Sequence, residues 1–191
     1  MNWLAHLYLS EPTPEFRIGN LLPDLTSASA LADLSPKFRR GVEQHRRIDA
    51  FTDSHPIVRQ SIGRIVPPFR RFGGILTDVF YDHFLAREWH TFSSLPLPDF
   101  ASEIYASFEC HRGEIPPEAY RRLEQMKAED WLCSYRDISG IATALKRIGM
   151  RLRRPTPLAE AVSIFQQHYD SFHSDFAAFF PELRVHVATK S

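Results

Sequence analysis

The feature that most constrains the fold is the recurrence of apolar side chains at three- and four-residue steps, in segments that prolines separate. Residues 73–90 and 158–180 show this helical spacing most clearly. No segment alternates apolar and polar side chains as a strand does, and no Asn-Gly or Asp-Gly pair marks a hairpin. The same spacing predicts further helices over residues 36–53, 99–111, 117–132 and 138–150. The sequence therefore predicts an all-α fold, a single helical bundle domain of about seven helices over residues 1–191.

Composition excludes several classes of protein. Lys plus Arg and Asp plus Glu both number 23, so net charge gives no argument for a nucleic-acid partner. The two cysteines, Cys110 and Cys133, are too few for a disulfide framework. No apolar run approaches the roughly 20 residues of a membrane span, and the apolar start lacks the basic region and cleavage site of a secretion signal. We therefore expect a cytoplasmic protein without a nucleic-acid or membrane partner.

The segment HRRIDAFTD at residues 45–53 places three polar side chains at four-residue steps. On a helix His45, Asp49 and Asp53 would share one face. An exposed face with His–Asp pairs is one interpretation, because such surface pairs are common. A metal site is the other, and this segment alone does not favour either.

A second segment, DVFYDHFL at residues 78–85, carries Asp78 and Asp82 four residues apart among apolar side chains. A helix that is apolar nearly all round is buried, and a buried carboxylate is costly unless it is paired or binds a metal. An arginine partner is the simpler explanation. A metal shared with the 45–53 face is the more specific one.

Two further candidates lie near the start of the chain. His6 sits in an apolar stretch, where a core histidine is the common alternative, and Asp24 follows Pro23, where a helix cap is the common alternative. Together the candidates form a set of imidazoles and carboxylates without a thiolate, which suits Mn²⁺, Mg²⁺, Fe²⁺ or Zn²⁺. Such a set on several helices of a bundle predicts a metal site for hydrolysis: His6, Asp24, His45, Asp49, Asp78 and Asp82.

Five blocks of the sequence resemble the acyl carrier protein phosphodiesterases and come in that family's order. They are NWLAHL at 2–7, GNLLPD at 19–24, HRRIDAFTD at 45–53, DVFYDHFL at 78–85 and WLxxYRD at 131–137. The resemblance implies an HD-domain-like helical fold. It implies an enzyme that removes the 4′-phosphopantetheine arm from holo acyl carrier protein and leaves the apo protein with a free serine. It also implies a divalent cation, typically Mn²⁺, with Mg²⁺ or Fe²⁺ as alternatives.

The resemblance and the residues together suggest roles for side chains around the predicted metal set. Water activated by the metal is the expected nucleophile. Arg46 and Arg47 follow His45 directly and are expected to hold a phosphate oxygen. His83 is the expected proton donor to the leaving serine oxygen. Acyl carrier proteins are acidic, so the densest basic cluster is expected to bind this partner: Arg151, Arg153 and Arg154.

Two other functions remain open at this point. One is another HD-like metal-dependent phosphodiesterase that acts on a nucleotide or a small phosphodiester and needs no basic docking face. The other is a non-enzymatic helical interaction module in which the acidic residues pair with arginines and bind no metal.

Overall fold

The computed structural model describes residues 1–189, and every regular element in that range is a helix. The all-α prediction is therefore confirmed. The described range holds 13 α-helices rather than about seven, together with two 3₁₀ helices labelled η. In chain order they are α1 (Trp3–Tyr8), α2 (Pro14–Leu25), α3 (Ala28–Ala32), α4 (Pro36–Ser54), α5 (Pro56–Gly63), η1 (Arg70–Phe72), α6 (Gly73–Arg87), α7 (Trp89–Phe92), α8 (Leu97–Glu109), α9 (Pro117–Ala128), α10 (Trp131–Ser134), α11 (Ile138–Arg151), η2 (Leu158–Ala161), α12 (Val162–Gln167) and α13 (Tyr169–Ala188).

The helix count differs because several elements are too short to show a periodic pattern. Helices α1, α3, α7 and α10 contain only 6, 5, 4 and 4 residues, less than two turns each. The predicted helix over 158–180 is divided among η2, α12 and α13, and α13 continues through Pro181 to Ala188. Within residues 1–189, none of these helices is long and apolar enough to cross a membrane.

Helices α2 and α4 pack backbone against backbone at two glycines. A Cβ atom on Gly19 would lie 2.2 Å from the carbonyl oxygen of Phe38, and one on Gly41 would lie 2.2 Å from the carbonyl oxygen of Phe16. No side chain fits at either position, so glycine permits the close approach. As a result the backbone beside Gly19 lies within hydrogen-bond distance of a side chain on α4, as described below.

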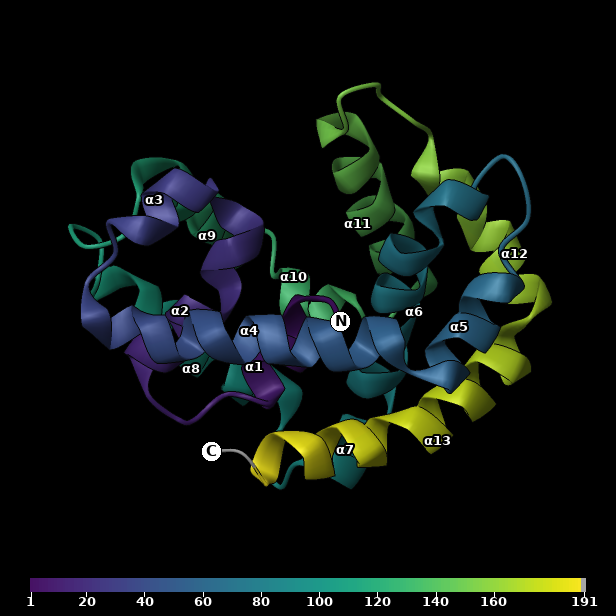
Figure 1. The fold of residues 1–191 in the computed structure, drawn as a ribbon, viewed down its shortest axis with the longest axis horizontal. Helices are drawn as coiled ribbons and strands as arrows, with labels where there is room; N and C mark the ends of the chain where they lie inside the picture. Colours follow the sequence, from purple (N-terminus) through teal and green to yellow (C-terminus); the bar gives the residue numbers. More distant parts are fainter. Residues whose placement is uncertain (190–191) are drawn as a thin grey trace.

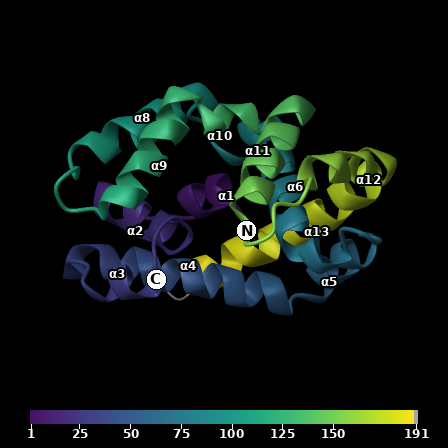
Figure 2. The same ribbon diagram turned by 90° about the horizontal axis from the view of Figure 1, so that it is seen from above.

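Helix α1 lies in the middle of the molecule. Figure 1 shows α4 crossing the front, with α11 and α6 on one side of the amino terminus and α3 and α9 on the other. Seen from above, α1 lies between α4 and the row formed by α8, α9 and α10 (Figure 2). This arrangement surrounds the short first helix with longer helices.

The core is rich in phenylalanine from α13 and its neighbours. Four phenylalanines of α13 are fully buried, as the amphipathic pattern predicts: Phe172, Phe176, Phe179 and Phe180. Phe80 of α6 stacks on Phe165 of α12 at 4.4 Å between ring centroids. These contacts fix α6, which carries two of the predicted site residues, against the C-terminal helices.

Candidate metal centre

Two histidines from separate helices stack at the centre of the site. The rings of His6 (α1) and His45 (α4) lie 4.1 Å apart between centroids and are inclined by 14°. Asp49, one turn after His45, contacts both: its Oδ1 lies 3.2 Å from Nε2 of His6 and its Oδ2 lies 3.0 Å from Nε2 of His45. Within the described part of the chain, this is the single group of three or more His, Cys, Asp or Glu side chains whose ligand atoms all lie within 4.8 Å of one another.

Asn20 of α2 determines the orientation of both imidazoles. Its side-chain nitrogen donates to the carbonyl oxygen of His6 at 2.8 Å and to Oγ of Ser10 at 2.9 Å, so its Oδ1 faces Nδ1 of His6 at 3.0 Å. The backbone carbonyl of Asn20 lies 2.7 Å from Nδ1 of His45. Because its partner is an acceptor, Nδ1 of His45 carries the proton when the ring is neutral. His6 has an acceptor at both nitrogens, Oδ1 of Asn20 at Nδ1 and the carbonyl oxygen of Met1 3.0 Å from Nε2, so either nitrogen can carry its proton. Nε2 of each ring lies towards Asp49, and it presents a lone pair when Nδ1 carries the proton.

This donor arrangement fits a divalent cation. With Nδ1 protonated on both rings, two Nε2 lone pairs would face carboxylate oxygens, which are acceptors only. Protonating both rings instead would place two stacked cations beside each other, with His6 fully buried. A cation between these atoms removes both conflicts, because imidazole nitrogen and carboxylate oxygen are ligands of Mn²⁺ and related ions.

The pKa values of the three groups follow from burial and from this geometry. Burial lowers the pKa of His6. Burial acts in the same direction on His45, but Asp49 and Asp24 outweigh it and raise its pKa. Burial alone would raise the pKa of Asp49, yet its contacts with His45 and His6, together with the α-amino group of Met1, hold it well below its usual range. Asp49 is therefore ionised over the whole physiological range.

Asp49 of this group lines a pocket of about 210 Å³, together with Asp24 and Asp78. Oδ1 of Asp24 lies 3.7 Å from Nε2 of His45, and its Oδ2 accepts a hydrogen bond from Nε1 of Trp3 at 2.9 Å. The α-amino group of Met1 lies 3.2 Å from Oδ1 of Asp78 and 3.3 Å from Oδ1 of Asp49. The two carboxylates thus already hold a positive charge between them. The structure groups the ligand atoms of three of the six predicted ligands, His6, His45 and Asp49, and places Asp24 and Asp78 in the adjoining pocket.

Asp82, the sixth predicted ligand, has a different position. Its Oδ2 accepts from the backbone N–H of Leu4 at 2.8 Å and its Oδ1 from that of Ala5 at 3.1 Å. These are N–H groups of the first turn of α1, which lack partners inside the helix. Burial raises the pKa of Asp82 to about 7. Asp82 thus caps α1 from α6 and fixes the helix that carries His6, and it does not belong to the ligand group.

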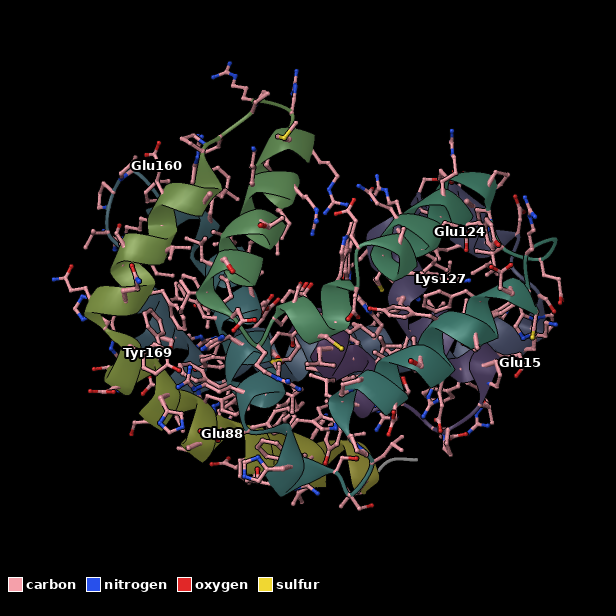
Figure 3. All side chains as sticks on the ribbon, turned by 180° about the vertical axis from the view of Figure 1, so that it is seen from behind. Glu15, Glu88, Glu124, Lys127, Glu160 and Tyr169 are labelled. Atoms are coloured by element: carbon pink, nitrogen blue, oxygen red, sulfur yellow. The ribbon has the colours of Figure 1, made fainter. Side chains whose placement is uncertain are left out.

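His83 is not placed at the site, which corrects its predicted role. It is fully buried, with Nδ1 2.9 Å from the carbonyl oxygen of Tyr135 and Nε2 3.0 Å from the hydroxyl of Tyr169. Figure 3 shows Tyr169 at the outer edge of the molecule, on the opposite side from Glu124 and Lys127 of α9. Both ring nitrogens face partners away from the metal group, and His83 does not line the pocket.

Arg46 and Arg47 are likewise not placed at the pocket. Successive residues of a helix point about 100° apart, so neither follows the direction of His45. Arg46 is exposed and lines a separate hollow against α3, and Arg47 does not line the metal pocket. Arg151, at the end of α11, does line it. Arg153 and Arg154 are exposed in the segment that follows α11.

Comparison with known proteins identifies the family. The sequence profile of the family described as acyl carrier protein phosphodiesterase matches residues 1–183. The chain belongs to the acyl carrier protein phosphodiesterase family. It is 34% identical to the acyl carrier protein phosphodiesterase of Yersinia enterocolitica over 193 aligned positions, which cover 100% of this chain and 99% of the relative. It is 32% identical to those of Enterobacter sp. strain 638 and Salmonella agona, again over 100% of this chain and 99% or 100% of the relative. No solved structure is significantly similar to the chain, and the HD-domain-like arrangement stays a prediction.

The sequence analysis missed three residues at the site of this phosphodiesterase family member. Asn20 is fully buried and holds both histidines, Trp3 donates to Asp24, and Nη1 of Arg122 lies 3.3 Å from the carbonyl oxygen of Asp24. An asparagine within the apolar run GNLL is a signal for the first, because a buried amide needs partners. The other two depend on contacts between helices distant in sequence.

Proposed function

We propose that this chain hydrolyses the phosphodiester that joins 4′-phosphopantetheine to holo acyl carrier protein. Water adds to phosphorus, the bond from phosphorus to the serine oxygen breaks, and the serine oxygen takes up a proton. The products are apo acyl carrier protein and 4′-phosphopantetheine. The observation that carries the proposal is the convergence of the ligand atoms of His6, His45 and Asp49 beside the pocket that Asp49 lines, in a chain of this family.

The residues of the pocket have separate tasks in this reaction. His6, His45 and Asp49 would hold the cation, Mn²⁺ by preference with Mg²⁺ or Fe²⁺ as alternatives, and Asp24 and Asp78 would complete its ligands. A bound cation of this kind lowers the pKa of water and neutralises charge on a phosphoryl oxygen. Asn20 keeps the Nε2 atoms directed inward, so a metal-free site needs little rearrangement before binding.

The basic segment after α11 supports a protein substrate. Arg153 and Arg154 are exposed, and Arg151 lines the pocket itself. An acidic carrier protein attracted to this segment would reach the surface beside the pocket. Attraction between exposed charges is screened by salt, so association should slow at high ionic strength.

The test is intact-mass analysis of holo acyl carrier protein after incubation with this chain and Mn²⁺, with and without EDTA. We expect loss of the phosphopantetheine mass with free Mn²⁺ and no loss in EDTA. Asp49→Asn should abolish the loss. Asp53→Asn is the matched control, since Asp53 is exposed one turn further along α4. Unchanged holo protein in Mn²⁺, Mg²⁺ and Fe²⁺, from a chain shown to be folded, would refute the proposal.

A further inference from the structure

Two guanidinium groups from different helices border the same end of the metal pocket. Arg122 of α9 donates from Nη1 to the carbonyl oxygen of Asp24. Arg151 of α11 lines the pocket beside Asp24, and its guanidinium carbon lies 5.8 Å from the centre of the Trp3 ring. Figure 2 shows α9 and α11 on the side of α1 that faces away from α4. The helices that carry Arg122 and Arg151 therefore lie across α1 from α4.

Neither arginine has an acidic partner. Among residues 1–189, no carboxylate oxygen lies within 4.0 Å of the guanidinium nitrogens of Arg122 or Arg151, whereas Arg147, one turn before Arg151, pairs with Glu129. Burial and then the charge of Arg122 lower the pKa of Arg151. Two like charges held close together destabilise the folded chain, and Asp24 and Glu118 offset this for Arg151 and Arg122 only from beyond ion-pair distance. An anion between them would offset that cost.

An aromatic stack holds Arg151 at the rim. The rings of Trp3 and Trp131 stack at 5.1 Å between centroids with an interplanar angle of 9°. Arg151 lies over Trp3, and Arg147 lies 4.5 Å from the centre of Trp131. Such cation–π contacts restrict a long side chain while leaving its N–H groups free to donate.

We propose that Arg122 and Arg151 form a phosphate clamp that holds the two non-bridging oxygens of the substrate phosphodiester. The inference rests on the proposed function. The planar guanidinium matches the geometry of two phosphate oxygens, and the negative charge on these oxygens grows as water adds to phosphorus. The clamp supplies the phosphate-holding role that the sequence had suggested for Arg46 and Arg47.

The test compares Arg122→Gln, Arg151→Gln, the double variant and the two Arg→Lys variants with wild type. The matched control is Arg121→Gln combined with Lys146→Gln, which removes the same charge from exposed positions on the same two helices. Each protein is assayed with Mn²⁺ on holo acyl carrier protein and on bis(4-nitrophenyl) phosphate, which has no protein part to dock. Calorimetric titration of inorganic phosphate into each Mn²⁺-loaded protein gives a readout independent of turnover.

We expect each Gln variant to lower kcat/KM about 10²- to 10³-fold on both substrates, with partial recovery in the Lys variants. Phosphate affinity should fall at least about tenfold in the double variant, or about 1.4 kcal/mol, while Mn²⁺ affinity and the control are unchanged. If the Gln variants lose activity on holo acyl carrier protein alone, the arginines dock the partner and the clamp is refuted.

The clamp and the proposed function can fail separately. If wild type hydrolyses the small diester but leaves holo acyl carrier protein intact, the proposed function fails, and loss of diester activity in the Gln variants still supports the clamp. If wild type hydrolyses neither substrate, the phosphate affinities measured by calorimetry decide whether the clamp is correct. Weaker phosphate binding in the double variant supports the clamp, whereas equal binding, or no binding by wild type, overturns it.

Discussion

Asn20→Ala separates the positioning of the histidines from their chemistry as ligands. The change removes three hydrogen bonds, to Nδ1 of His6, to the carbonyl oxygen of His6 and to Oγ of Ser10. It leaves the backbone carbonyl that accepts from His45. His6 therefore loses the partner of its Nδ1 and keeps only the contacts of its Nε2 with Met1 and Asp49, while His45 keeps the partner of its Nδ1.

The expected magnitudes follow from burial and partner number. Asn20 is fully buried, and each buried polar group left without a partner costs about 1–3 kcal/mol. The free energy of unfolding should fall by about 3 kcal/mol or more, which lowers Tm by roughly 6–12 °C for a chain of this size. Loss of a residue that orients a metal ligand weakens metal binding about 10- to 100-fold, or roughly 1.4–2.7 kcal/mol.

The assay is electron paramagnetic resonance of free Mn²⁺ during titration, with thermal unfolding measured on the same samples. Two variants separate stability from affinity. Asn20→Asp keeps an acceptor for Nδ1 of His6 but loses both donors, so stability should fall while Mn²⁺ affinity stays close to wild type. Ser10→Ala removes a partner of Asn20 without touching His6 Nδ1, and its Mn²⁺ affinity should also be unchanged.

One result would refute this reasoning. If Asn20→Ala loses stability as expected but binds Mn²⁺ within about twofold of wild type, the orientation of His6 does not matter for the metal. The assignment of the proton to Nδ1 and of the ligand atom to Nε2 would then be wrong for this ring.

Three further predictions concern the helix crossing, the docking segment and pH. Gly41→Ala places a methyl group 2.2 Å from the carbonyl oxygen of Phe16, so α2 and α4 must separate and the free energy of unfolding should fall by about 3 kcal/mol or more. If denaturant unfolding gives the wild-type free energy, the close packing of α2 on α4 at Gly41 is wrong. Arg153→Glu with Arg154→Glu should raise KM for holo acyl carrier protein about tenfold and leave the small diester unaffected; equal loss on both substrates contradicts docking. Neighbouring carboxylates raise the pKa of His45, so the protonated ring must lose a proton before a cation can bind to it. Mn²⁺ affinity should therefore fall by up to about tenfold per pH unit below that pKa. An Mn²⁺ affinity that does not change between about pH 6 and 8 would exclude His45 as a ligand.

The fold class followed from periodicity, but the short helices did not. An apolar repeat needs at least two turns to be recognised, and α1 has only six residues. That helix carries His6 and Trp3, so part of the site lay in an element the sequence does not reveal. The sequence does predict the long helix α4, and the four-residue spacing correctly predicts that Asp49 lies beside His45.

The sequence pattern does not predict the direction in which the side chains of α6 point. Most of its residues are buried, so no polar stripe indicates which face meets which neighbour. Asp78, Asp82 and His83 were therefore grouped by proximity in sequence, although they face the pocket, the start of α1 and the core respectively. Arg122 and Arg151 became neighbours through the packing of α9 and α11, which no local spacing encodes.

The cap that Asp82 gives to α1 has a consequence for synthesis of the protein. The two backbone N–H groups that donate to Asp82 lie 78 and 77 residues earlier in the chain. A six-residue helix is not stable on its own in water, so α1 must wait for α6 to be made. At about 5–20 residues per second, that interval is roughly 4–16 s. During it His6 has no fixed position, and a ribosome-bound chain has no complete metal site until α6 has emerged and docked.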